Sequence, residues 1–462
     1  MQKEGFYPQP LFDFGKHPDF QKNYEKDMKT FYAEREHMNF EKCYELVNGK
    51  IVCLSDFHNP KHPEVFLIPR DQNISVVDEF GDQIGIMQTM FPFSSTDFYV
   101  DFFETPGSVF YELYHAIPFI RLGGITQLES LVPPRPDDWD KEIEVCYCLP
   151  QFPHTRWLHS LITAILMELV LANNGFPKKE RAPIVLTAGC HDIATPAAGD
   201  TIIRLGPEMD EEENFSWVMR KYGLDETWKS LFGFDLNPAQ KWVKGQGIMG
   251  KLLDVVDKMS YTAIDCYRLG QIREGNVRNI CLENPLLMDI WQDVRLTKNR
   301  QKVYFLNPEK LFNFLLLRVY EFKELLLNPY ARMVDFLVEK LTKPFYEKGD
   351  ITKEDLLTWE DKDLFRVLQE KYPEKNIFLL EPEQMEWQVF ETKEQMHEAV
   401  SELGNRVDHT EHLNGFFSGL NWLVPGKRDE LKTLRETIDQ KKVEMIEEVI
   451  ESTKGYYVYY YK

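Results

Sequence analysis

Three stretches of the chain place apolar residues at helical spacing, and each of them also carries imidazole or carboxylate side chains. In the first stretch, 156–175, Leu161, Ile165 and Leu169 fall on one helical face, and the neighbouring face is apolar as well. A helix that is apolar on most sides is buried in the interior of a protein. We therefore predict a buried helix here, with His159 in its first turn.

The second apolar stretch, 182–196, is predicted to form a helix that ends at His191 and Asp192, before Pro196. Proline disfavours a helical conformation in the residue before it and commonly follows the end of a helix. The pattern therefore places an imidazole and a carboxylate side by side at the end of an apolar helix.

The third stretch, 251–270, carries acids on a largely apolar helix. Asp257, Tyr261 and Asp265 recur every four residues, so they share one face of the predicted helix. An unpaired carboxylate in apolar surroundings is very costly, which means that these acids need partners. A divalent cation is one such partner.

Together, His159, His191, Asp192 and Asp257 form a candidate set of metal ligands. Two neutral imidazoles and two carboxylates suit one borderline or hard divalent metal, such as Mn, Fe, Zn or Mg. An ion held by four side chains would keep positions for water and for a substrate phosphate. The alternative is that these are two core histidines and ordinary acids on helix faces.

Outside these stretches the pattern divides the chain into three regions. Residues 1–104 are expected to form a small β-containing extension, because short apolar runs alternate there with Asn-Gly, Asn-Pro and Gly-Asp turn signals. The predicted strands are 49–54, 64–69, 73–77 and 83–87. Residues 105–370 are expected to form a helical core and 371–462 a C-terminal, mainly helical α(+β) extension with a role in oligomerisation. The predicted fold class is therefore mainly α.

Three segments of the C-terminal region have patterns of their own. Residues 408–412, DHTEH, are interpreted as an exposed helix start, and a second metal site there is not favoured. Residues 431–452 have the pattern of a charged amphipathic helix. The aromatic run 455–462 is typical of a strand, which we expect to pack on the body of the protein or on a partner subunit.

Composition narrows the functional classes. The chain has 462 residues, 43% of them hydrophobic, and a net charge of −21. Such an excess of acids argues against a surface that coats nucleic acid or binds anionic membranes, although a local basic pocket could still bind a small anion. The first residues lack the pattern of a signal peptide, and the longest apolar run is too short to span a bilayer. With seven scattered cysteines, we expect reduced thiols and a cytoplasmic location.

Several segments resemble, in the same order, the HD-domain superfamily of metal-dependent phosphohydrolases. The clearest are FIRLGGITQL (119–128), HTRWLHSL (154–161), AGCHD (188–192) and VVDKMSYTAIDCYRLG (255–270), with weaker matches at 315–322 and 351–364. Within the superfamily, the chain is most similar to the deoxynucleoside triphosphate triphosphohydrolases, meaning the bacterial dGTPases and the mammalian SAM-and-HD-domain dNTPase. The resemblance implies an HD-fold helical core whose outer helices pack subunits into a homo-oligomer.

The resemblance also implies roles for five substrate-binding residues. Gln127 would reach the 3′-hydroxyl of the deoxyribose, and Tyr261 with Asp265 would recognise the sugar. Arg156 and Lys258 would bind the phosphates. From the residues alone, Arg156 lies close to one helical turn before the first histidine, where a guanidinium can bind phosphate oxygens beside a metal.

The chain departs from the family where the family carries additional histidines. Thr195 and Asp200 stand at two of these places, and Glu212, Glu213 and Asn214 replace a downstream Glu-His pair. A general acid or base must hold and release a proton near the working pH, which threonine cannot do. Asp200 or Glu213 could, if burial raises its pKa. They are therefore the predicted catalytic residues.

The expected activity is the metal-dependent hydrolysis of a deoxynucleoside triphosphate to the nucleoside and triphosphate. The changed acid–base set leaves two alternatives open. One is hydrolysis of another nucleotide, such as a monophosphate or a cyclic nucleotide. The other is a protein that senses nucleotides with little turnover.

Overall fold

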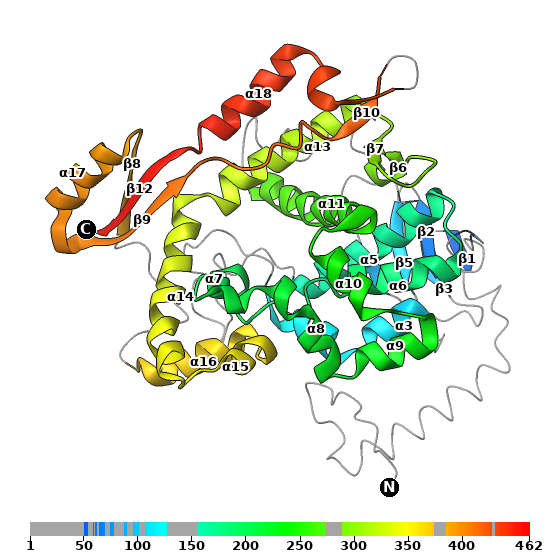
Figure 1. Cartoon of the computed structure of the whole chain (residues 1–462), viewed down its shortest axis with the longest axis horizontal. Coiled ribbons are helices and arrows are strands. Elements are labelled where there is room, and N and C mark those ends of the chain that lie inside the picture. Colours follow the sequence, from blue (N-terminus) through cyan, green and yellow to red (C-terminus); the bar gives the residue numbers. More distant parts are fainter. Residues whose placement is uncertain are drawn as a thin grey trace, which may run out of the picture. The chain divides into compact units, whose positions relative to one another are not determined.

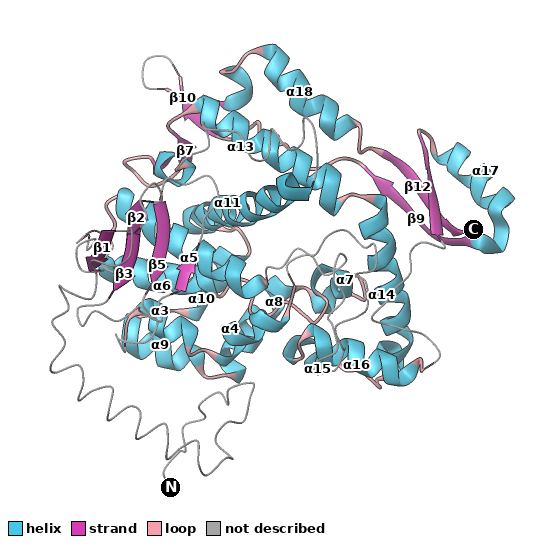
Figure 2. Ribbon diagram, turned by 180° about the vertical axis from the view of Figure 1, so that it is seen from behind, coloured by secondary structure: helices cyan, strands magenta, loops and turns pink. Residues whose placement is uncertain are grey.

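Helices make up most of the described chain, which confirms the predicted mainly α fold class (Figures 1 and 2). The computed structural model describes residues 50–53, 59, 61, 64–69, 74–77, 87–89, 96–100, 107–126, 155–272, 289–373, 385–426 and 430–462. No helix among these residues has the length and apolar character that crossing a membrane requires.

The helices that surround the predicted ligands fall between residues 109 and 272. They are α3 (Val109–Tyr114), α4 (Ile117–Arg121), α5 (Arg156–Asn173), α6 (Lys178–Gly189), α7 (Gly199–Ile203), α8 (Glu211–Lys221), α9 (Leu224–Phe232), α10 (Leu236–Val243) and α11 (Gly247–Ile272). Short 3₁₀ turns occur at η3 (Leu122–Gly124) and η5 (Pro207–Met209). Helix α5 packs on both α6 and α11, so the three predicted ligand stretches share one core.

The remaining helices follow residue 289. They are η7 (Ile290–Asp293), α13 (Pro308–Glu321), the π-helical η8 (Phe322–Leu326), α14 (Pro329–Lys348), α15 (Lys353–Thr358), α16 (Asp361–Lys371), α17 (Lys393–Leu403), η10 (Gly404–Arg406), η12 (Leu434–Glu436) and α18 (Gln440–Glu451). Helix α13 lies against α11, and its continuation into η8 brings a turn of wider π geometry beside the predicted site. π-Helical turns are frequent at functional sites.

The described residues also form four small sheets. The strands are β1 (Lys50–Cys53), β2 (Val65–Pro69), β3 (Ile74–Val77), β4 (Met87–Thr89), β5 (Thr96–Val100), β6 (Val294–Leu296), β7 (Val303–Phe305), β8 (Met385–Phe390), β9 (Val407–Leu413), β10 (Leu423–Pro425), β11 (Leu431–Thr433) and β12 (Gly455–Tyr461). Their orders are β1-β3, β2-β5-β4, β11-β10-β7-β6 and β8-β12-β9. The β1–β3 pair is parallel and belongs to a compact unit of its own, drawn from residues 1–56 and 72–84. Strands were therefore predicted correctly at 49–54, 64–69 and 73–77, whereas most of 83–87 lies outside the described residues.

The apolar periodicity located α5 and α11 well but misjudged the ends of the second helix. Helix α6 begins at Lys178 and ends at Gly189, whereas the predicted helix began at Ala182 and ended at His191 and Asp192, so the prediction is wrong at both ends. It begins with three exposed polar residues, Lys178, Lys179 and Glu180, which do not belong to the apolar pattern. His191 and Asp192 consequently lie in the turn after the helix rather than on it.

Gly189, the last residue of α6, marks a close approach between helices and leads to a stability prediction. A Cβ atom at this position would lie 2.8 and 2.9 Å from the two Cδ atoms of the fully buried Leu113 on α3. We expect Gly189→Ala to lower the free energy of unfolding by about 1–3 kcal/mol, because overpacking forces buried side chains to shift. Urea denaturation measures this change. Gly123→Ala, where a Cβ meets nothing within 4 Å, should stay within about 0.5 kcal/mol of the parent. Equal stability of the two variants would contradict the packing argument.

In the C-terminal region two of three predictions need correction. Residues 408–412 lie in β9, not at a helix start, because this segment pairs with the aromatic strand β12 along its length. His409 and His412 are three residues apart on that strand and therefore point to opposite faces. The helix predicted over 431–452 begins only at Gln440, after β11 and η12. The strand expected at 455–462 is confirmed as β12, the central strand of its sheet.

Candidate metal centre

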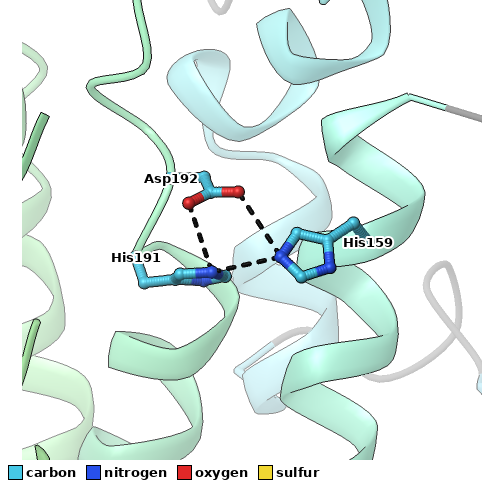
Figure 3. Close-up of side chains that lie close together, drawn as sticks. All are labelled: His159, His191 and Asp192. Carbon is cyan, nitrogen blue, oxygen red and sulfur yellow. Dashed lines mark hydrogen bonds and ion pairs between the residues drawn. The ribbon is translucent and has the colours of Figure 1, made fainter. Parts of the chain in front are cut away.

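Four side chains from three separate elements converge on one point. His159 lies in the first turn of α5, His191 and Asp192 follow α6, and Asp257 lies in the middle of α11. Figure 3 shows the first three side chains directed toward one another. The Nε2 atoms of the two imidazoles are 3.2 Å apart, and Asp257 Oδ1 lies 3.0 Å from that of His159 and 3.2 Å from that of His191. One oxygen of Asp192 is 3.2 Å from His191 Nε2, and the other is 3.5 Å from His159 Nε2.

These spacings fit ligands of a common cation. Two donors about 2.1 Å from one ion lie roughly 3.0–3.4 Å apart at octahedral or tetrahedral angles. One donor atom from each of His159, His191 and Asp192 lies within 4.8 Å of the others. Two imidazole nitrogens and carboxylate oxygens are also the ligand types that divalent transition metals prefer. The cluster could therefore hold a metal ion.

Hydrogen bonds on the far side of each imidazole aim its Nε2 atom at this point. His191 Nδ1 lies 2.7 Å from the carbonyl oxygen of Ala188, which can only accept, so Nδ1 carries a proton. Ser260 donates its hydroxyl proton to the carbonyl of His159, and its oxygen then accepts from His159 Nδ1 at 3.1 Å. With both Nδ1 atoms protonated, each neutral imidazole offers its Nε2 lone pair to a metal.

The charges of the cluster favour a bound cation as well. Burial alone would lower the pKa of His191, but the carboxylates of Asp192 and Asp257 raise it to about 10. Burial would raise the pKa of Asp257, yet hydrogen bonds from the two imidazoles hold it well below its usual value. The two carboxylates thus bind positive charge at the Nε2 position, and a divalent cation can take the place of that proton.

The turn that carries the cluster is held in place by two distant side chains. Buried Arg121 donates to the carbonyl oxygens of Ile193 and Thr195 at 3.1 and 2.6 Å. Asp361, at the start of α16, accepts a 2.8 Å hydrogen bond from the backbone N–H of Ala198. Ala198 has φ of 58°, a conformation that few non-glycine residues adopt without such support. These contacts order the segment that directly follows the two ligands.

Arg156 lies beside the cluster with its guanidinium almost wholly buried. Its Nη1 atom is 3.3 Å from Asp192 Oδ2 and 3.8 Å from Glu211 Oε2, and its Nη2 atom is 3.0 Å from Asp200 Oδ1. A guanidinium in this position combines five donors with a fixed charge next to the place where a metal would be held.

The structure places the other predicted site residues in different surroundings. Tyr261 and Asp265 line the same cavity as the cluster. Lys258 instead pairs with Asp254, one turn earlier on α11. Gln127 lies outside the described residues. The substrate-binding roles of all these residues, and that of Arg156, stay predictions.

The two predicted acid–base residues are on the surface. Asp200 is 76% exposed, and Glu213 is 62% exposed and paired with Lys244. Neither carboxyl group has the burial on which the prediction of its role depended. Their roles stay predictions, but the buried acid in this part of the site is a different one.

Glu211 is the acid that the sequence analysis missed. It is the first residue of α8, its side chain is 21% exposed, and its Oε2 atom accepts a hydrogen bond from the Thr195 hydroxyl. Burial, followed by the nearby charge of Asp192, raises its pKa to about 8. A signal was present in the sequence: Asp210 is a favoured N-cap residue and caps α8, which places Glu211 in the first helical turn.

A second missed acid, Glu321, lies at another wall of the cavity. Its carboxyl group shares a hydrogen bond with that of Asp265, and its Oε2 atom accepts from the Thr262 hydroxyl at 2.7 Å. Burial raises the pKa of both acids, that of Glu321 to about 7. Two carboxylates in such close contact cannot both be ionised, so the pair holds a proton near neutral pH.

A cavity of about 490 Å³ connects these groups, which is within the usual size of small-molecule sites. Its lining includes His159, His191, Asp192, Asp257, Arg156, Glu211, Tyr261, Asp265 and Glu321, together with Trp242, Lys244, Leu253, Phe322 and Leu326. The prospective metal ligands, the arginine and the protonated carboxyl pair therefore face one ligand-sized space.

No protein-family model and no curated protein sequence matches the chain. Solved structures do resemble it. A phosphohydrolase from Bacteroides thetaiotaomicron aligns with 82% of this chain and 100% of its own, with a TM-score of 0.56 at 15% identity. A hypothetical protein from Aquifex aeolicus aligns with 81% of this chain and 96% of its own, with a TM-score of 0.53 at 19% identity. The chain shares its fold with these two bacterial proteins.

Proposed function

We propose that the protein is a metal-dependent phosphohydrolase that acts on nucleotides. The observation that carries the proposal is the convergence of His159, His191, Asp192 and Asp257 beside a buried arginine, in a cavity large enough for a nucleotide. The shared fold with a protein named a phosphohydrolase supports it further. When bound, one divalent cation would supply a Lewis acid that polarises the phosphoryl group and lowers the pKa of a water molecule.

The chain's own residues have separate roles in this proposal. Arg156 would donate to phosphoryl oxygens and neutralise the charge that develops on them. Glu211 would hold a proton on its carboxyl group and deliver it to the leaving oxygen. Tyr261 and Asp265 would orient the sugar at the other side of the cavity, with Gln127 as the proposed contact to its 3′-hydroxyl.

The reaction expected from the sequence resemblance is hydrolysis of a deoxynucleoside triphosphate to nucleoside and triphosphate. A second candidate reaction is the hydrolysis of a nucleoside monophosphate. It is favoured because the exposed carboxylates Asp200, Glu212 and Asp254 line the cavity and would repel the additional phosphates of a triphosphate. A nucleotide-sensing protein would bind the same ligands without turnover. A homo-oligomeric assembly in the cytoplasm stays part of the proposal.

Product analysis tests this function. The protein is incubated with deoxynucleoside mono- and triphosphates in the presence of Mn, Mg, Co, Fe or Zn, and the products are separated by anion exchange. Inorganic triphosphate identifies the first reaction and orthophosphate the second. Failure to release either product with any metal would contradict hydrolysis of both nucleotide classes and favour a sensing role.

A further inference from the structure

We infer that the site takes a nucleotide with a single phosphoryl group and discriminates against triphosphates. This inference rests on the proposed function and narrows its substrate class. It follows from the charges around the cavity: the cationic groups that line it are already paired with carboxylates, and further carboxylates stand exposed beside them.

Two cationic side chains line the cavity among the described residues, and carboxylates oppose both. Arg156 faces Asp192 and Asp200 at 3.3 and 3.0 Å. Lys244 Nζ lies 2.5 Å from Glu213 Oε1. An incoming phosphate must therefore compete with these carboxylates for each cation. A single phosphoryl group beside the metal cluster needs only Arg156 as its cationic partner.

A third cation near the cavity, Lys258, pairs with a carboxylate and is therefore not available to bind a phosphate. It lies one helical turn after Asp254 on α11 and its ammonium group pairs with that residue's carboxylate. Asp254 lines the cavity and is 47% exposed, so its carboxylate faces the space that a ligand would occupy. Because the Lys258–Asp254 pair is neutral as a unit, its effect is to keep the ammonium group of Lys258 from an incoming phosphate.

Two more exposed acids, Asp200 and Glu212, line the cavity with Asp254. A triphosphate carries more negative charge than a monophosphate, and like charges repel each other. Because the three carboxylates are partly in water, salt should weaken the repulsion. The inference therefore predicts a preference for monophosphates that is strongest at low ionic strength.

The test measures binding and turnover by the full chain loaded with Mn²⁺, with free Mn²⁺ held equal in all samples. The ligands are the four deoxynucleoside 5′-monophosphates and their 5′-triphosphates, and calorimetry gives the dissociation constants. At low salt we expect the best monophosphate to bind about tenfold more tightly than its triphosphate, and the ratio to shrink at high salt. A triphosphate that binds as tightly as its monophosphate, or more tightly, would overturn the inference.

The second part of the test uses the Asp254→Asn variant, because this change removes the carboxylate charge and releases the ammonium group of Lys258. We expect the affinity for the triphosphate to improve by about three- to tenfold relative to the monophosphate. Glu226→Gln on α9, an exposed acid outside the cavity lining, makes the same change in net charge and should leave the ratio as it is. A ratio that neither salt nor Asp254→Asn alters would also overturn the inference. Turnover is scored separately: monophosphate binding without hydrolysis contradicts the proposed function but leaves the preference standing.

Discussion

Replacement of Asp192 by asparagine is expected to lower kcat/KM by at least about 10³-fold, since loss of a bound metal removes several kcal/mol of transition-state stabilisation. Asparagine keeps the shape of the side chain but removes the charge that faces both imidazoles at 3.2 and 3.5 Å. It also replaces the carboxylate that pairs with Arg156 at 3.3 Å by a neutral amide. The kcat/KM value from steady-state kinetics and the metal content of the purified protein, measured by mass spectrometry, should both decrease.

The matching change on the second ligand is His191→Ala, for which we expect an equal loss. His397→Ala is its control, because this exposed histidine lies on α17, outside the cavity lining. The control should retain metal and turnover. Circular dichroism at increasing temperature checks that all three variants are folded. Folded Asp192→Asn and His191→Ala proteins that keep both their metal and their turnover would disprove the metal assignment.

Glu211→Gln is expected to lower kcat by about 10²- to 10³-fold while the metal content stays unchanged, because a missing proton donor affects the chemical step alone. Glutamine can still accept the hydrogen bond from Thr195, so the local structure should persist. In the parent protein, burial and the nearby carboxylate of Asp192 raise the pKa of Glu211 to about 8. The proton-donating form is therefore present below that pH and is lost as the pH rises through it.

The pH profile of kcat gives this prediction a signature that damage to the structure would not produce. The parent should lose activity on the alkaline side, and Glu211→Gln should lack that limb. Asp200→Asn and Glu213→Gln provide the comparison, since these were the acids predicted from the sequence. If either of them removes the alkaline limb and Glu211→Gln leaves it intact, the sequence prediction is right and the assignment to Glu211 is wrong.

The contrast between these acids shows where the sequence stops being informative. Asp200, Glu211 and Glu213 all follow the ligands His191 and Asp192 in the sequence, and each could act as an acid on chemical grounds. What separates them is burial. Glu211 turns inward at the first residue of α8, where it contacts Thr195 and is 21% exposed, whereas the side chains of Asp200 and Glu213 are mostly exposed. The direction of each side chain depends on how α7 and α8 pack against segments distant in sequence.

The same limit applies to the carboxyl pair and to the turn after the ligands. Glu321 is 56 residues from Asp265 in the sequence, and only the packing of α13 on α11 brings their carboxyl groups together. Arg121 belongs to a segment that resembles the HD-domain superfamily, but the sequence does not predict its hydrogen bonds to the carbonyl oxygens of Ile193 and Thr195. Every residue has a backbone carbonyl group, so the sequence does not indicate which side chain donates a hydrogen bond to a particular carbonyl.

By itself, the sequence determined the mainly α fold class, the interior helices α5 and α11, and the four side chains that converge. These are consequences of helical periodicity and of the cost of burying unpartnered polar groups, which are local properties that a single chain displays. Tertiary structure alone decided which acids are protonated, which cations remain available to a phosphate, and how the turn after α6 is held. Those properties depend on distances between elements far apart in the sequence, because desolvation and charge interactions are set by spatial neighbours.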